Sequence, residues 1–512
     1  MFEQARGDEI LQSNFGLQSF RRGQVEILSS VLSRKDTLAV MPTGGGKSLC
    51  YQLPALYQEG IVLVVSPLIS LMKDQVNSLR SKGISGSCLH SNQHLGEKRE
   101  IFKEMNCASS YLLYLSPERV QNPGFADWFK KAPVSLVAID EAHCVSQWGP
   151  DFRQDYYRLH LLREWRPDVP ILALTATATP LVLGDISQNL KLNKPESHVY
   201  GFYRPNLYYQ VEFCVDDLEK EALLQKALHK FSEGRVIIYA GTRKRCEELS
   251  ERILQNFKDV DYYHAGLSKE ERNQTQDAFE KGSVRILVAT NAFGMGVDLP
   301  DVRLVVHFQM PANIDSYYQE IGRGGRDGKP STCLLLYSKK DKGLPSYFIT
   351  RSDADSQTVK HRWRALDAMV QYAEGGECRH AGILTYFRDS QRIISCGHCD
   401  VCVSNSNRKV ESLKMTDMPR PKKIKKRAGK SIVYKNLSSE EIRRKNHIRK
   451  WRLDYANEED IPAFMVFSNK TLDQLARTNP TSKEELKKIH GIGSHKVCAF
   501  GEKLLRVLNE FS

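Results

Sequence analysis

The sequence predicts two α/β domains in tandem, each with a parallel sheet, followed by a helical module with clustered cysteines and a small C-terminal helical bundle. Two observations lead to this prediction. Residues 1–340 contain short, uninterrupted apolar runs rich in β-branched residues, the pattern of strands buried on both faces. The segments between these runs are long enough for the crossover helices that parallel strands need.

The apolar runs form two series. The first lies at residues 36–42, 61–67, 111–117, 135–140 and 171–177, and the second at 206–213, 235–241, 284–290, 303–309 and 332–338. The sequence HVYGFYRPN, near residues 195–206, separates them. We therefore expect one domain over residues 1–200 and another over 201–345.

Downstream of residue 345 the chain is charged and has helical periodicity. We expect a cysteine-bearing module at 346–405, a basic linker at 406–437 and a helical bundle at 438–512. Within the bundle, Gly491 and Gly493 indicate a tight turn between two helices.

Composition argues against several classes of protein. With 512 residues, 41% of them hydrophobic, the chain is too long for one compact core, and its mean hydropathy of -0.44 is typical of a soluble protein. It has no apolar run long enough for a transmembrane helix, and its N-terminus lacks a signal-peptide pattern. The 12 cysteines are too few for a disulfide scaffold, so we expect a reducing cytoplasm.

The positive charge is concentrated in one segment. The net charge is +13, and residues 403–435 carry eleven lysines or arginines against two acidic residues, centred on PRPKKIKKRAGK. Such a segment is either a solvated linker or a tether that releases counterions from a polyanion. Nucleic acid is the partner that this charge favours.

A glycine-rich loop follows the first apolar run and precedes a segment with helical character. It reads as a phosphate-binding loop made of Thr43, Gly44, Gly45, Gly46, Lys47 and Ser48. The glycines let backbone N–H groups approach phosphate oxygens, the lysine reaches the β- and γ-phosphates, and the serine is a ligand for Mg²⁺. Met41 stands where the general pattern has its first glycine, and a simple glycine-rich turn is the alternative.

Two adjacent carboxylates end the run at 135–140. Nucleotide hydrolysis needs one carboxylate for the metal and another to activate the attacking water, so we assign Asp140 to Mg²⁺ and Glu141 to the water. An acidic helix N-terminus would explain either residue alone. It does not explain why this motif and the phosphate-binding loop both follow strands of one sheet.

Two arginines in GRGGRDG follow the helix expected at SYYQEI. Three residues apart, Arg323 and Arg326 would share a face of one helical turn, and planar guanidinium groups suit transferring phosphates. We expect Arg326 to be the main arginine finger, Arg323 to support it and Gln319 to line the same cleft. A basic surface helix is the alternative.

The clustered cysteines have the spacing of a metal site. Cys396, Cys399 and Cys402 form C-x2-C-x2-C, and Cys378 lies upstream. Four thiolates fit a tetrahedral Zn²⁺ whose binding folds a segment with little core. Three alternatives stay open: His398 in place of one cysteine, an iron–sulfur cluster, and free buried thiols.

Taken in order, these motifs resemble those of superfamily-2 helicases, and specifically the RecQ family of DNA helicases. The resemblance rests on FRRGQ (20–24), VVSPLISLMKDQV (64–76), DEAHCVSQWGPDFR (140–153), TATAT (175–179), ATNAFGMGVDLPDVRLVVHF (289–308) and SYYQEIGRGGRDG (316–328). It covers about residues 10–405 and a C-terminal segment similar to the family's HRDC module. It implies two RecA-like lobes, ATP hydrolysis with Mg²⁺, and a structural Zn²⁺ on the four cysteines.

The resemblance also implies roles for individual residues. Arg21 and Gln24 would lie at the adenine, and Thr175 and Thr177 would couple the two lobes.

The loop SQWGPDFR would sense single-stranded DNA. Trp148 and Phe152 offer faces on which bases stack, and Arg153 supplies a cation near phosphate. The alternative is that both rings belong to the hydrophobic core.

Three features depart from the family pattern. The segment before the HRDC-like tail is too short for the winged-helix domain of many RecQ proteins. Leu17 replaces a stacking aromatic residue, and Gly324 replaces the usual alanine or threonine between the two arginines. In the tail, Lys487, Lys488, His490 and Lys496 either contact DNA or form a solvated helix face.

The leading hypothesis is an ATP-dependent 3′→5′ DNA helicase of recombination and repair. The alternatives are a DNA-stimulated ATPase that translocates or anneals strands with poor unwinding, a non-catalytic DNA-binding scaffold, and an RNA helicase. We expect a cytoplasmic monomer, nucleoid-associated in a bacterium, without a membrane. Its expected partners are single-stranded and partly duplex DNA, a single-strand-binding protein and repair factors.

Overall fold

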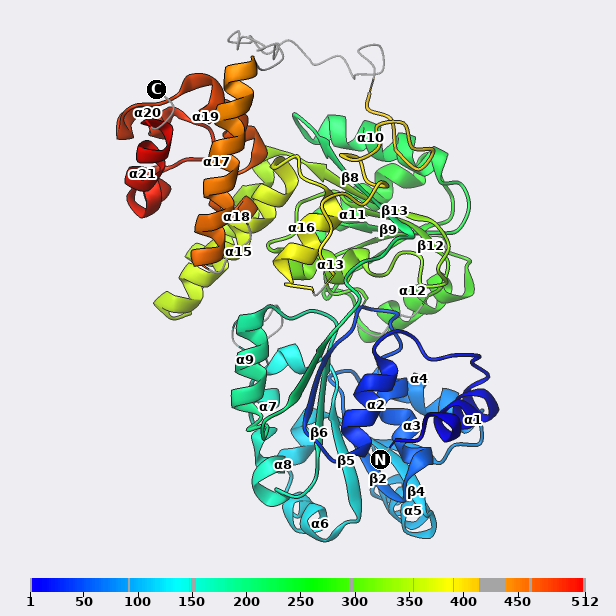
Figure 1. Cartoon of the computed structure of the whole chain (residues 1–512). Helices are drawn as coiled ribbons and strands as arrows, with labels where there is room; N and C mark the ends of the chain where they lie inside the picture. Colours follow the sequence, from blue (N-terminus) through cyan, green and yellow to red (C-terminus); the bar gives the residue numbers. More distant parts are fainter. Residues whose placement is uncertain are drawn as a thin grey trace.

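The computed structural model describes residues 2–90, 93–146, 148, 153–294, 299–352, 354–389, 391–413, 438–459 and 463–509. Two α/β lobes, lobe 1 (residues 2–199) and lobe 2 (207–350), lie one below the other in Figure 1. A cysteine module (354–413) packs on lobe 2, and a helical bundle (438–509) lies beside it. The predicted fold class is confirmed.

Lobe 1 is built on a seven-stranded parallel sheet in the order β3-β4-β2-β5-β6-β1-β7. Its strands are β1 (Thr37–Val40), β2 (Gly60–Val65), β3 (Gly86–Leu89), β4 (Ser110–Leu115), β5 (Val134–Ile139), β6 (Ile171–Thr175) and β7 (Glu196–Val199). Its helices are α1 (Gln4–Phe15), α2 (Gln24–Leu32), α3 (Leu49–Tyr57), α4 (Ile69–Arg80), α5 (Leu95–Cys107), α6 (Phe125–Lys131), α7 (Gln154–Tyr157), α8 (His160–Trp165) and α9 (Pro180–Asn189), with short 3-10 turns at Pro117–Gln121 and Ala142–Val145. All five predicted runs form strands. The sequence prediction missed β3 and β7, the two edge strands.

Lobe 2 repeats this architecture with six parallel strands in the order β10-β11-β9-β12-β13-β8. The strands are β8 (Leu207–Phe213), β9 (Arg235–Tyr239), β10 (Val260–Tyr263), β11 (Ile286–Ala289), β12 (Val302–His307) and β13 (Ser331–Tyr337). The helices are α10 (Asp217–Lys230), α11 (Arg243–Leu254), α12 (Lys269–Lys281), α13 (Ile314–Ile321) and α14 (Gly343–Thr350), with a 3-10 turn at Lys339–Lys342. The one strand missed here, β10, is again at a sheet edge.

The rest of the described chain is helical. The cysteine module contributes α15 (Ser356–Glu374) and α16 (Arg379–Tyr386), and the bundle contributes α17 (Ser439–Glu458), α18 (Ala463–Val466), α19 (Asn469–Thr478), α20 (Lys483–Lys488) and α21 (Ser494–Asn509). Gly491, at φ +85°, lies in the predicted turn between α20 and α21. No helix in the described ranges is both long and apolar enough to cross a bilayer.

The start of the expected basic linker is folded onto lobe 2. Val410 is fully buried, and its N–H and C=O groups both pair with the side-chain amide of Gln210 on β8, at 2.8 and 2.6 Å. Arg408 also donates to the backbone oxygen of Asn206 at 3.0 Å. Residues 404–413 therefore form a strap across the edge of the sheet, and the remaining basic residues, 414–437, lie outside the described ranges.

A connector, residues 200–206, joins the two sheets. One buried apolar cluster runs through both lobes and the cysteine module, and it includes Phe202 of the connector. The Phe202 ring stacks on Phe387 with centroids 4.3 Å apart. The backbone carbonyl of Phe202 accepts a hydrogen bond from the Tyr318 hydroxyl at 3.1 Å. The connector is therefore part of the core.

A buried ion pair in lobe 2 gives a stability prediction. Lys220 is fully buried and donates to both carboxylate oxygens of Asp341, at 2.7 and 2.8 Å. Lys220→Ala removes the cation and leaves the buried carboxylate of Asp341 unpaired. We therefore expect it to lower the free energy of unfolding by about 3–5 kcal/mol. Denaturant unfolding measures this loss. Lys244→Ala, at an 86% exposed side chain 3.8 Å from Glu248, serves as the control and should change stability by less than about 0.5 kcal/mol. Equal losses in the two variants would contradict the prediction.

Candidate functional site: the cleft between the lobes

The glycine-rich loop lies between β1 and α3, as predicted. Gly44 and Gly46 have φ values of +74° and +82°, a backbone region that side chains disfavour. The Lys47 ammonium lies over the loop, 3.4 Å from the backbone oxygen of Met41 at the end of β1. Ser48 is the N-cap residue of α3, so its hydroxyl stands at the positive end of a helix.

Arg21 and Gln24 hold this loop directly. The buried Gln24 amide accepts from the backbone N–H of Arg21 at 2.7 Å and donates to the carbonyl of Gly46 at 2.9 Å. The Arg21 guanidinium donates to the carbonyl of Gly44. Both side chains therefore bind carbonyls of the phosphate-binding loop, and their expected contact with adenine stays a prediction.

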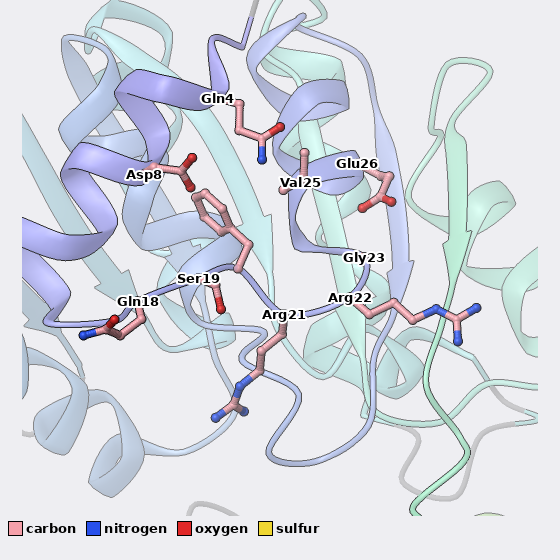
Figure 2. A pocket seen from close by; sticks show the side chains of 10 residues that line it. Gln4, Asp8, Gln18, Ser19, Arg21, Arg22, Gly23, Val25 and Glu26 are labelled. Carbon is pink, nitrogen blue, oxygen red and sulfur yellow. The ribbon is translucent and has the colours of Figure 1, made fainter.

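A cavity of about 540 Å³ adjoins these residues (Figure 2). Gln4 and Asp8 of α1 line one wall, while Arg21 and Arg22 leave the loop in different directions. Phe20 also lines the cavity. Sequence reasoning missed this aromatic residue because it looked for a ring at position 17. The Phe20 ring packs edge-on against Phe2, with centroids 6.2 Å apart.

The two carboxylates lie at the end of β5 with different environments. Burial and the neighbouring Glu141 charge raise the pKa of Asp140 to about 6. Burial would also raise the pKa of Glu141, but a hydrogen bond with His143 and the Lys47 charge lower it to about 2. His143 lies 3.3 Å from Glu141 and 2.9 Å from the Thr175 hydroxyl. Glu141 is therefore ionised at neutral pH, and its φ of +48° is a strained conformation of the kind found at functional sites.

Of the two arginines on lobe 2, Arg326 lies against the phosphate-binding loop and Arg323 lies close enough to Glu141 to affect its charge. The predicted helical turn is wrong in detail, because α13 ends at Ile321 and the glycines that follow continue the chain as a loop. The Arg323 guanidinium donates to the carbonyl of Gly294, and its charge contributes to the low pKa of Glu141. Arg326 lies so close to Gly44 that a Cβ there would be 3.4 Å from its Cγ. We call the segment of residues 322–328 the finger loop.

Hydrogen bonds connect the two walls of the cleft. The Gln319 amide donates to the Thr177 hydroxyl at 3.0 Å, and the Thr175 hydroxyl donates to the carbonyl of Thr177 at 3.0 Å. The Thr43 hydroxyl donates to the carbonyl of Gly322 at 3.0 Å. The residues predicted to couple the lobes are thus in contact.

The aromatic loop after the carboxylates packs on the cysteine module. Trp148 is half-buried, and its ring lies edge-on to His361 of α15, with centroids 5.3 Å apart. The Arg153 guanidinium donates to the carbonyl of Pro67 at 3.2 Å. Phe152 lies outside the described residues. Trp148 thus packs at the edge of the buried apolar cluster and also contacts α15, so it connects lobe 1 to the cysteine module.

The four cysteines come together as predicted. The sulfur atoms of Cys378, Cys396, Cys399 and Cys402 all lie within 4.8 Å of one another. Those of Cys396 and Cys402 are 3.9 Å apart, close to the edge of about 3.8 Å that a tetrahedron with Zn–S bonds of about 2.3 Å requires. Contacts among the thiols lower the pKa of Cys378 and raise that of Cys396, because neighbouring thiols share protons when no metal is bound. The donor set fits Zn²⁺.

The basic residues of the bundle divide between two environments. Lys487 and Lys488 are exposed. His490 instead lies 3.6 Å from Glu374 at the end of α15, and Arg452 lies 3.3 Å from Glu377. The bundle therefore contacts the cysteine module through the Arg452–Glu377 ion pair and the His490–Glu374 contact.

Four protein families match successive parts of the chain. They are the DEAD/DEAH box helicase over residues 21–184, the helicase conserved C-terminal domain over 219–328, RecQ zinc-binding over 339–403 and the HRDC domain over 443–508.

Individual relatives agree with these matches. The ATP-dependent DNA helicase RecQ of Pasteurella multocida is 32% identical over 601 aligned positions, which cover 98% of this chain and 93% of that protein. RecQ of Bacillus subtilis is 32% identical, with 99% of each chain covered.

Solved structures share the fold at low identity. The helicase MrfA bound to DNA has a TM-score of 0.54 and 18% identity, with 74% of this chain and 54% of that chain covered. The Mycobacterium smegmatis helicase Lhr bound to single-stranded DNA and AMP-PNP has a TM-score of 0.52 and 19% identity, with 70% and 48% covered. From the four family matches and the full-length relatives, the chain belongs to the RecQ family of ATP-dependent DNA helicases.

Proposed function

We propose that this chain hydrolyses ATP in the cleft between its lobes and uses the cycle to move 3′→5′ along single-stranded DNA and separate duplexes. The main support is the position of Arg326, on lobe 2, against Gly44 of the phosphate-binding loop on lobe 1. Groups from opposite walls can therefore act on one triphosphate. A guanidinium at the transferring phosphate stabilises the charge that develops there.

Each residue has a role in this scheme. Lys47 and the loop glycines bind the phosphates, and Mg²⁺ held by Ser48 and Asp140 would neutralise their charge. Glu141, ionised by its surroundings, orients the attacking water. Arg326 binds the transferring phosphate and Arg323 supports it, so the cleft is complete only when the lobes are closed.

The coupling to DNA is proposed to run through Trp148. Its ring connects the loop after the carboxylates to α15, so a base that stacks on it would shift both. Stacking contributes about 1–3 kcal/mol per base, similar to the roughly 1.4 kcal/mol lost per opened duplex step. The basic residues 414–437 are proposed to add non-specific contact with DNA phosphates.

A second candidate is a translocating or annealing ATPase with poor unwinding. The strap ends at residue 413 and the bundle begins at 438, which leaves too few residues for a winged-helix domain. The alignment with the Pasteurella multocida relative extends over 601 positions, more than the 512 residues of this chain, so that relative carries segments without a counterpart here.

Strand displacement on 3′-tailed, 5′-tailed and forked duplexes tests the proposal. We expect the wild-type chain to separate the 3′-tailed and forked substrates with ATP.

The phosphate-binding role of Lys47 is tested by substitution. Lys47→Ala should lower kcat for DNA-stimulated hydrolysis by about 10²-fold or more, because it removes a phosphate contact. Lys35→Ala, at an exposed lysine paired with Glu196, is the matched control and should behave as wild type. Hydrolysis without displacement would support the second candidate, and no hydrolysis would exclude both.

The Trp148 role has its own test. We expect Trp148→Ala to abolish the stimulation of ATP hydrolysis by single-stranded DNA while DNA binding is largely kept, because phosphate contacts dominate affinity. Hydrolysis rates with and without an oligonucleotide, together with fluorescence anisotropy, measure the two effects. Trp165→Ala removes a ring that packs on Phe125 and Phe129, so it should lower stability yet keep the stimulation. Kept stimulation in Trp148→Ala would show that its ring serves only packing.

Metal content tests the cysteine site. We expect close to one zinc per chain, and Cys399→Ser should lose the metal and lower the unfolding temperature, because zinc binding contributes folding free energy in such modules. Cys107→Ser, at an exposed cysteine of α5, should retain the zinc and the unfolding temperature of the wild type. Iron and sulfide in place of zinc would instead indicate a cluster.

A further inference from the structure

Arg204, in the connector between the sheets, forms hydrogen bonds with backbone carbonyl groups on both walls of the cleft. One guanidinium nitrogen, Nη1, lies 3.3 Å from the carbonyl oxygen of Thr43 in the phosphate-binding loop. The other, Nη2, donates to the carbonyl oxygens of Gly324 and Gly325 in the finger loop, at 2.9 and 3.2 Å. Nη1 also lies 3.5 Å from the carbonyl of Gly322, at the outer limit of a hydrogen bond. One side chain thus links the two loops.

The chemistry of these partners requires an arginine. The carbonyls of Gly322, Gly324 and Gly325 belong to the loop after α13 and point to one place, where several hydrogen-bond donors are needed together. A guanidinium has five donors in a planar fork and no acceptor, so it can bind several such oxygens at once. An ammonium keeps the charge but not the fork.

The backbone of the connector is held independently of the cleft. The N–H of Phe202 donates to the buried Asp389 carboxylate at 2.9 Å, and the Arg204 carbonyl lies 3.1 Å from His380 Nε2. Both partners belong to the cysteine module. The backbone at Arg204 is therefore fixed by the cysteine module, so the Arg204 side chain can hold the finger loop in place relative to the connector.

What the side chain holds is the segment that precedes Arg326. The Asn206 amide donates to the carbonyl of Gly325 at 2.8 Å, and Gly325 has a φ of +55°. Arg326 follows directly and lies against Gly44. A shift of the Gly324–Gly325 backbone would therefore move the guanidinium that we propose to act on the transferring phosphate.

We propose that Arg204 is a positioning residue: it sets the finger loop against the phosphate-binding loop in the closed cleft. This inference rests on the proposed ATP hydrolysis. Arg204 acts through Arg326 and does not itself touch the nucleotide. Its contact with the Thr43 carbonyl spans the cleft, so it also favours the arrangement in which the two loops face each other.

The test is Arg204→Lys, which keeps the charge and the aliphatic stem. We expect kcat for DNA-stimulated ATP hydrolysis to fall by about 10²-fold, because a displacement of about 1 Å at a reacting group has this effect. KM for ATP and the Kd for a single-stranded oligonucleotide should change by less than about threefold, because an interaction realised in the transition state leaves ground-state binding intact. A residue with a merely structural role would not produce this split.

Arg235→Lys is the matched control. Arg235, a partly buried arginine of β9, likewise donates to backbone carbonyls, those of Phe279 and Glu280, and pairs with Asp301, so these partners lie outside the finger loop. Both variants should unfold within a few degrees of each other. Should Arg204→Lys be much less stable than the control, Arg204→Gln, which keeps an amide donor, replaces it in the same comparison.

A double variant decides how Arg204 acts. We expect Arg326→Ala to have a low kcat and the combination with Arg204→Lys to be no slower, since nothing remains to be positioned. Independent, multiplicative losses would overturn the inference, as would an unchanged kcat in a folded Arg204→Lys protein. A wild-type chain without DNA-stimulated hydrolysis would overturn the proposed function and this inference with it, whereas an active wild type insensitive to Arg204→Lys would overturn the inference alone.

Discussion

Two kinds of contact join the lobes, and they differ in strength. The connector and the cysteine module share one buried apolar cluster with both sheets, so hydrophobic burial stabilises this junction between the lobes. Across the cleft, by contrast, the contacts are hydrogen bonds such as Thr43 to Gly322 and Gln319 to Thr177. Each such bond contributes only about 0.5–1.5 kcal/mol net, because water replaces it when the cleft opens. In the proposed cycle the buried connector would stay intact while these hydrogen bonds break and reform, and the catalytic roles proposed above depend on this difference.

The electrostatics of the cleft separate the two carboxylates. Asp140 and Glu141 are adjacent, yet the pKa of Asp140 is raised and that of Glu141 is lowered. Lys47 and His143 surround Glu141 from lobe 1, and Arg323 adds its charge from lobe 2. Arg323 is the one of these groups that lies on lobe 2, so the charge environment of Glu141 is built from both walls of the cleft.

Much of the fold could be predicted because the strands at the centre of each sheet are buried on both faces and read as apolar runs. The missed strands, β3, β7 and β10, are all edge strands, which need less apolar sequence. The site motifs were predicted because the residues of each lie close together in sequence. Contacts between distant segments could not be predicted, because the tertiary fold alone brings such residues together. Examples are the contacts of Arg204 with Thr43, Gln210 with Val410, and Trp148 with His361. The finger loop was expected to be helical because the spacing of its arginines is also compatible with a helix, and its glycines decide otherwise.

The short stretch between the strap and the bundle constrains how strands are separated. A winged helix that wedges a duplex end would supply part of the free energy of melting, and residues 414–437 are too few to form one. In the proposed scheme, the melting of each base-pair step would then be met by the motor itself, through hydrolysis and through stacking on Trp148. Stacking contributes about 1–3 kcal/mol and a duplex step costs roughly 1.4 kcal/mol, so one stacked base would offset about one opened step. Since G·C-rich steps cost more to open, the proposed motor should unwind a duplex more slowly as its G·C content rises.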